Sequence, residues 1–169
     1  MRKLYALLLT VVMLTALTMS ALAAQSPAAV AKESVAAVVV EVAGATVTQA
    51  STALVQDVFS LVNNDEHMAN LGVPANANVA AVVNINFTGE IPAGGVQIPI
   101  KVENAEVGDY VIVLHRCSTT GVWSVVGRGV LGADKTIVGT FLSFSPVVIL
   151  KVDAANYAAA GIRAPKTGQ

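Results

Sequence analysis

The side chains best suited to chemistry are His115 and Cys117, which stand two residues apart in an apolar segment. Residues two apart on a β-strand share a face, so this imidazole and this thiol could both contact one metal ion. A zinc site needs four ligands, or three and a water, and Asp65-Glu66-His67 is the other candidate cluster. That cluster is explained more simply as a helix start, because acidic side chains favour the positive end of the helix dipole. We therefore expect no bound metal and no cofactor.

Cys117 is the only cysteine in the chain. A single cysteine forms no internal disulfide, so the core must supply the stability of the fold. Such a cysteine is most often a small buried side chain, which is the expectation here. An interchain disulfide and a reactive nucleophile are the alternatives.

Motifs of the common enzyme classes do not occur in the sequence. It has no Gly-x-Ser-x-Gly elbow, no His-Glu-x-x-His pair and no phosphate-binding glycine loop. Four acidic residues could supply the two carboxylates of a glycoside hydrolase, but all are expected near strand ends, where solvated charges are common. They are Glu41, Glu90, Glu103 and Asp109. We therefore predict that the protein is not an enzyme.

Binding is harder to exclude than catalysis. Sandwich modules that bind sugars stack them on exposed aromatic rings, and Trp123 begins an expected strand directly after a turn. Trp123 is thus the candidate ligand contact, with burial in the sandwich core as the alternative. Asn86-Phe87-Thr88 matches the acceptor pattern for N-glycosylation. The net charge of −1 and the scattered Lys and Arg residues argue against binding to nucleic acid.

The N-terminal residues have the pattern of a secretion leader. Met1-Arg2-Lys3 is basic, Leu4 to Met19 is apolar, and Ala21-Leu22-Ala23 supplies small residues for cleavage. The apolar run is shorter than the ~20 residues of a spanning helix, which disfavours the alternative of a retained membrane anchor. We therefore predict a signal peptide over residues 1–23, a loose leader over residues 24–34 and no membrane span after cleavage.

Most of the remaining sequence predicts β-strands. Residues 109–153 alternate apolar β-branched runs with turn sequences about every ten residues, which is the spacing of an antiparallel sandwich. Tyr110 to Cys117 is apolar on both faces, so we expect a central strand covered on each side. Val96 to Glu103 alternates regularly but contains Pro99, which predicts an edge strand. Further strands are expected over residues 34–44, 79–88, 123–130, 136–142 and 147–152.

One segment has the helical period instead. From Thr48 to Asn63 the apolar residues recur on one face, which predicts an amphipathic helix inserted after the first strand. Either Thr48 or Ser51 can cap its start, because a side-chain oxygen accepts a free amide of the first turn. A further helical turn is expected over residues 66–71, with Asp65 as its cap.

The flexible tail predicted over residues 154–169 contains Ala164-Pro165-Lys166-Thr167-Gly168. This segment resembles the sorting motif Leu-Pro-any-Thr-Gly of sortase-anchored surface proteins of Gram-positive bacteria, with Pro165 fixing an extended backbone. The resemblance implies attachment at Thr167, with Gly168 in the leaving fragment. Ala164 stands where the family has Leu, and the sequence ends at Gln169 before the usual apolar segment and basic tail, so a truncated chain and a lost anchor are both open. A tail without a sorting role is the alternative.

The C-terminal third also resembles β-sandwich modules of secreted and surface proteins from the same bacteria. The resemblance is carried by Gly108-Asp109-Tyr110, Leu114-His115, Gly121-Val122-Trp123-Ser124-Val125-Val126, and Phe141 to Pro146 followed by Val147-Val148-Ile149. It implies a fold and an extracellular location, but no ligand.

Taken with the strand pattern, these features predict a mainly β (α+β) protein, an antiparallel immunoglobulin-like β-sandwich over residues 35–153. Its expected role is that of a non-catalytic secreted or cell-surface structural or interaction module, with cell-wall or surface components as partners. An extracellular carbohydrate- or peptide-binding module is the alternative, and the oligomeric state is open.

Overall fold

The computed structural model describes residues 26–144 and 146–159. The signal peptide predicted over residues 1–23 and the sorting-like segment Ala164 to Gly168 lie outside these ranges, so both stay predictions. Within the described residues, no helix is long and apolar enough to cross a membrane.

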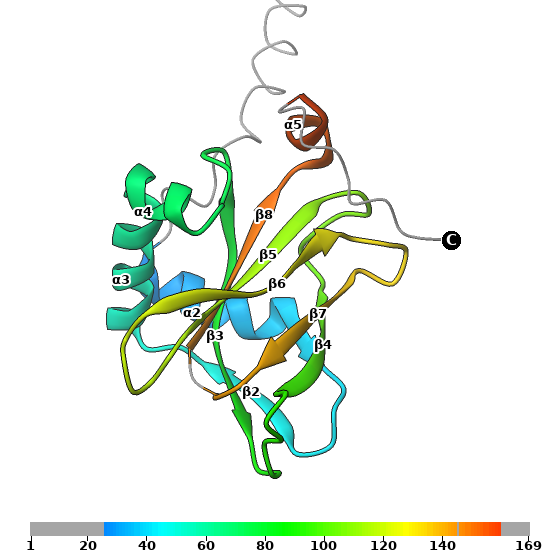
Figure 1. The fold of residues 1–169 in the computed structure, drawn as a ribbon. Coiled ribbons are helices and arrows are strands. Elements are labelled where there is room, and N and C mark those ends of the chain that lie inside the picture. Colours follow the sequence, from blue (N-terminus) through cyan, green and yellow to red (C-terminus); the bar gives the residue numbers. More distant parts are fainter. Residues whose placement is uncertain (1–25, 145, 160–169) are drawn as a thin grey trace, which may run out of the picture.

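Two antiparallel sheets form the body of the protein (Figure 1). One sheet has five strands in the order β2-β3-β8-β5-β6, and the other has three in the order β1-β4-β7. The strands are β1 (Val38–Val40), β2 (Ala45–Gln49), β3 (Asn78–Phe87), β4 (Val96–Val102), β5 (Tyr110–Arg116), β6 (Trp123–Val130), β7 (Thr136–Phe141) and β8 (Pro146–Val152). The prediction of a mainly β, antiparallel, sandwich-like protein is therefore confirmed.

The five-stranded sheet is covered on both faces. On β5, alternate side chains enter two different cores, and each of them is at least nine-tenths buried. Tyr110, Ile112 and Leu114 join the helix-side core with residues of the helices, whereas Val111 and Val113 join the inter-sheet core with Ile98, Ile100 and Phe141. The expectation of a central strand covered on each side is confirmed, since β5 lies between β8 and β6.

The amphipathic helix predicted after the first strand is present as α3 (Thr52–Val62), but it follows the second strand, β2. Ser51 caps it, because its hydroxyl accepts a hydrogen bond from the Leu54 amide at 3.2 Å, while Thr48 lies in β2. A short helix, α4 (Asp65–Asn70), follows directly. Its cap is Asn64 and not Asp65, since the Asn64 amide oxygen accepts the His67 N–H at 3.0 Å.

The N-terminal part of the domain differs from the sequence-based expectation. The loose leader predicted over residues 24–34 is wrong from Pro27 onward, because α2 spans Pro27–Ala37. The strand predicted over residues 34–44 is present only as β1, Val38–Val40. The helix starts with Ser26 as its cap and a proline in its first turn, where the missing amide has no cost. Its buried residues, Val30, Ala31, Ser34 and Ala37, form one stripe at helical spacing. The β preference of the valine run that follows is retained in β1, so the helix replaces only the first residues of the predicted strand.

Helix α2 covers a stretch of β3 that β2 does not reach. The pairing of β2 with β3 ends at Gln49 and Val83. The next residue of β3, Val82, is buried, and its amide has no acceptor on β2. The Ser34 hydroxyl accepts this amide at 2.9 Å and donates to the Val30 carbonyl at 2.7 Å. Ser34 thereby joins the helix to the sheet edge.

A second side chain completes the same edge. The Asn104 side-chain amide donates to the Ala80 carbonyl at 2.7 Å. An unpaired buried backbone group costs about as much as a lost hydrogen bond, so these polar contacts let the part of β3 that β2 does not pair lie inside the protein.

The prediction that Val96 to Glu103 forms an edge strand is wrong, because β4 lies between β1 and β7. The proline is nevertheless accommodated for a local reason. Strand β1 ends opposite Ile100, so Pro99 has no strand partner on the β1 side of β4. The N–H that proline lacks is therefore not needed for a hydrogen bond to β1. Pro99 is paired only with Val138 of β7.

The two sheets meet closely where β6 passes β7. A Cβ atom on Gly127 would lie 2.5 Å from the Val138 carbonyl oxygen, which is inside contact distance. Glycine at this position therefore allows the backbones to approach, and β6 and β7 shield each other's outer edges.

Replacing Ser34 with alanine should destabilise the domain by about 1–3 kcal/mol, because the buried Val82 amide loses its acceptor. The matched control is Ser60→Ala, since Ser60 makes the same hydroxyl-to-carbonyl contact within a helix but on an exposed surface. That control should change stability by no more than about 0.5 kcal/mol. Urea unfolding followed by circular dichroism measures both variants, and equal effects would show that the Ser34–Val82 contact is not important for stability.

Candidate functional site

Trp123, the ligand contact predicted from the sequence, is half-buried at the start of β6. It lies opposite Arg116 of β5 and packs against the helix-side core. The guanidinium carbon of Arg116 is 6.0 Å from the centre of the indole ring, a distance at which a cation attracts the ring face. The ring is therefore neither fully in the core nor fully in solvent.

Arg116 is held by the hairpin and faces a helix. Its Nε donates to the Gly121 carbonyl at 3.2 Å, and its terminal nitrogen lies 3.7 Å from the Asp57 carboxylate of α3. Both charged side chains are more than one-third exposed, so this ion pair contributes little stability. Its effect is positional, because it fixes a guanidinium beside the indole.

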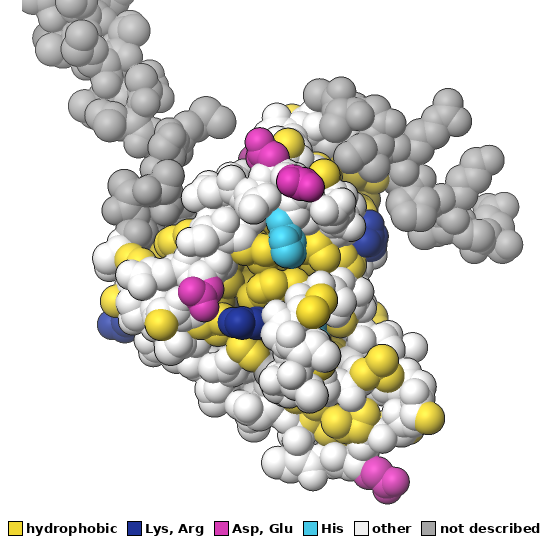
Figure 2. All heavy atoms as spheres, turned by 60° about the vertical axis from the view of Figure 1, so that its left-hand side comes forward, with side chains coloured by type: hydrophobic (Ala, Val, Ile, Leu, Met, Phe, Trp, Pro, Cys, Tyr) yellow, Lys and Arg dark blue, Asp and Glu magenta, His cyan; other side chains and the backbone are white. Residues whose placement is uncertain are grey.

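On this side of the molecule, apolar side chains lie in a recess with charged groups around it (Figure 2). Leu61, Leu71, Trp123 and Val125 are partly buried residues that pack against the helix-side core. A half-exposed ring next to a guanidinium can contact the apolar face of a ring-shaped ligand, while the guanidinium donates hydrogen bonds to acceptor atoms of that ligand. We call Asp57, Arg116 and Trp123 the tryptophan platform.

A separate hollow lies between α3, α4 and the start of β3. It has a volume of about 330 Å³ and adjoins a smaller one of about 110 Å³. The larger hollow is lined by Phe59, Val62, Asn63, Asp65, Ala75, Ala77, Asn78 and Val79. Trp123 is not among them, so the structure does not bring the predicted ligand contact to this hollow. Phe59 and Val62 belong to the apolar residues of the predicted helix, and no sequence signal marks them as lining a hollow.

His115 and Cys117 do not form a shared site. Strand β5 ends at Arg116, so Cys117 already lies in the following turn. His115 is buried between the sheets, where its ring meets the Phe141 ring edge-on at 5.7 Å. Burial lowers the pKa of His115, which favours the neutral imidazole. Among the residues that the structure describes, no three His, Cys, Asp or Glu side chains gather closely enough to hold a metal ion.

The expectation that Cys117 is fully buried is wrong, because this residue is only half-buried. Hydrogen bonds from the Thr120 side chain, and then from the Thr120 and Thr119 amides, lower the pKa of its thiol to about 7. The turn that creates these contacts is closed by the Cys117 amide, which donates to the Val122 carbonyl at 3.0 Å. The thiol is therefore partly ionised at neutral pH, and the sequence holds no second cysteine with which it could form an internal disulfide.

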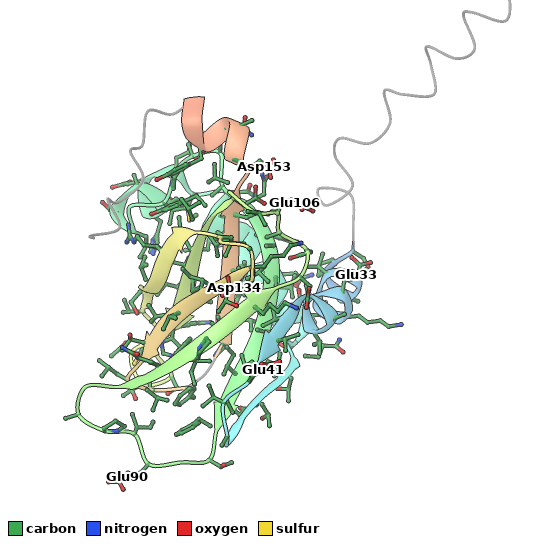
Figure 3. The ribbon with its side chains drawn as sticks, turned by 90° about the vertical axis from the view of Figure 1, so that its right-hand side faces the viewer. Glu33, Glu41, Glu90, Glu106, Asp134 and Asp153 are labelled. Carbon is green, nitrogen blue, oxygen red and sulfur yellow. The ribbon has the colours of Figure 1, made fainter. Side chains whose placement is uncertain are left out.

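The acidic residues considered for catalysis lie in different parts of the fold. Glu90 is at the tip of the β3–β4 loop, and Glu41 is beside β1, well separated from it (Figure 3). Glu103 is exposed and pairs with Lys101 at 2.6 Å. These positions agree with solvated charges near strand ends.

Asp109 differs from the other acidic residues because it is buried. Its carboxylate accepts the Glu106 amide at 2.9 Å and the Ala154 amide at 3.0 Å, and Lys151 lies 3.5 Å away. The expectation of a solvated charge is therefore wrong for Asp109, which ties the loop before β5 to the start of α5 (Ala154–Ala159). Burial alone would lower the pKa of Lys151, but its contacts with Asp153 and Asp109 outweigh burial and raise it.

Comparison with known proteins adds no functional assignment to this geometry. Searches against protein-family models, curated proteins and solved structures each found no match. The function must therefore be argued from the tryptophan platform, the hollow beside α3 and the buried polar groups.

Proposed function

We propose that this protein is a non-catalytic, secreted or cell-surface interaction module of a bacterium. The observation that carries the proposal is the use of the buried polar residues. Ser34 and Asp109 hold sheet and loop amides, and His115 contacts the Phe141 ring inside the inter-sheet core. These groups, which could do chemistry elsewhere, are thus part of the scaffold. We also propose that the sandwich is immunoglobulin-like. Two antiparallel sheets that share a core support this class.

The secreted location is supported by the basic and apolar leader pattern of residues 1–23. Ser26, the cap of α2, is the third residue after the end of the predicted signal peptide. Wall attachment is supported by the sorting-like segment at residues 164–168, which follows α5. A sortase requires an extended segment outside the folded domain, and Pro165 favours such a backbone.

Fractionation of native cells with intact-mass measurement tests this location. We expect a species that lacks the leader and is joined to wall peptide through Thr167. Thr167→Ala should move the protein from the wall fraction to the medium, because the scissile carbonyl is no longer presented by the recognised residue. Lys166→Ala is the matched control, since any residue is accepted at that motif position, and it should stay in the wall. Unmodified protein found only in the medium would contradict wall attachment.

The alternative, a module that binds carbohydrate or peptide ligands, is favoured by the tryptophan platform. The half-exposed indole and the nearby guanidinium offer an apolar face and a cation side by side. Trp123 is the only tryptophan in the chain, so its fluorescence reports on this site alone.

Titration with soluble wall glycans and with wall peptides should change Trp123 fluorescence if the platform binds them. By calorimetry, Trp123→Ala should weaken that binding about tenfold or more, as expected for an aromatic anchor. Val122→Ala is the matched control, because Val122 is the neighbouring residue and its side chain is 62% exposed. A similar loss in both variants, or no response to either ligand class, would argue against the platform as a binding site.

A further inference from the structure

The outer edge of β2 is an open edge of the five-stranded sheet. Strand β2 pairs with β3 on one side and is last in the strand order. In Figure 3 it is the cyan strand near Glu41, at the margin of the ribbon. Thr46, Thr48 and Gln49 are exposed, and Val47 is half-buried. The strand therefore presents both backbone groups and side chains to the surroundings.

The hydrogen-bond pattern fixes which backbone groups point outward. The Thr88 amide donates to the Gly44 carbonyl at 3.0 Å, so Gly44 and Thr88 form a hydrogen-bonded pair. Bonded and non-bonded pairs alternate in an antiparallel ladder, so Thr46 and Thr48 also bond to β3. The N–H and C=O of Val47 and the N–H of Gln49 consequently point away from β3. The Ala45 amide also points outward, and it donates to the Val42 carbonyl of the preceding turn at 2.9 Å.

Other sheet edges in the described part of the chain are protected. Strands β6 and β7 face each other at Gly127, and β1 has only three residues. Short strands and covered edges are the usual means by which proteins prevent edge-to-edge pairing. No strand of the described residues pairs with the outer side of β2, which is longer than β1, and its sequence Ala45-Thr46-Val47-Thr48-Gln49 contains no charge, proline or glycine. A free, uncharged edge of this kind accepts another extended strand.

We propose that β2 pairs with β2 of a second copy of this chain, antiparallel, about a twofold axis at Val47. The sequence Thr46-Val47-Thr48 reads the same in both directions, so a twofold axis at Val47 places each Thr46 opposite the partner's Thr48. The two Val47 residues then exchange both backbone hydrogen bonds, and each Gln49 N–H donates to an Ala45 carbonyl. The outward groups of β2 are those that such a pair requires.

The side chains on the two faces of β2 fit the same arrangement. Val47 packs against the inter-sheet core. In the dimer, the two Val47 side chains would therefore join the inter-sheet cores of the two copies across the axis. On the opposite face, Asn86 donates to the Thr48 hydroxyl at 3.1 Å, and Asn84 donates to the Gln49 carbonyl at 3.1 Å. Cross-strand threonine pairs are favourable, and no like charges meet at the axis. The joined sheet would therefore be polar on one face and apolar on the other.

Light scattering during gel filtration of the folded domain over a concentration series tests the proposal. We expect a monomer–dimer equilibrium for the native sequence. Val47→Pro should shift it to monomer, because the proline removes an outward N–H that β3 does not use. Val47→Thr is the matched control, since it keeps both the amide and the β-branched shape, and it should still form dimers. A monomer at all soluble concentrations, or a dimer unaffected by Val47→Pro, would overturn the proposal.

A charge-pairing experiment separates specific pairing from a folding defect. Thr46→Lys with Thr48→Lys should give monomers, because the lysines of the two copies would lie opposite each other. Thr46→Glu with Thr48→Glu should do the same. A mixture of the two double variants should form heterodimers, since opposite charges now face each other across the axis. Monomers in the mixture, with both variants folded by circular dichroism, would contradict β2 pairing.

Discussion

Burial of β5 and β8 on both faces is the constraint on which the rest of the structure depends. Strand β8 lies between β3 and β5, and its residues 147–150 are fully buried. A strand that is apolar on both faces needs a layer on each side, because either exposed face would place several valine and leucine side chains in water. The three-stranded sheet supplies one layer, and the helices supply the other.

Because β3 is also covered by these layers, the backbone groups along its edge need hydrogen-bond partners. This strand is longer than β2, so part of its edge must be covered by something other than a strand. Helix α2 lies there, and Ser34 accepts the amide of Val82 while Asn104 donates to the carbonyl of Ala80. The same edge of the sheet is thus closed by a helix along one half and left open at β2 along the other. One topological feature accounts both for the buried polar contacts and for the exposed strand.

Much of the β structure could be predicted because its residues alternate or are apolar on both faces, as in β4 and β5. Helix α2 is hard to predict because the valine run that follows it favours a strand, although the alanines of α2 favour a helix and Ser26-Pro27 is a recognisable helix start. Pro99 indicated an edge strand, but β4 has a neighbour on each side. The proline fits because β1 ends opposite Ile100, and the sequence around the proline does not show where β1 ends. For the candidate site, the position of Trp123 after a turn was predictable. Its contact with Arg116, and the position of Asp57 near that arginine, depend on how α3 packs across the sheet.

Native-state hydrogen exchange tests the central claim, that two-sided burial of β5 and β8 organises the fold with α2 as an integral part. The account predicts the slowest exchange for amides of β5 and β8, with the α2 amides and that of Val82 protected in the same cooperative unit. Exchange of α2 as fast as that of the exposed β3–β4 loop, with β5 and β8 still protected, would contradict the account. It would mean that the sheets are stable without the helix at their edge.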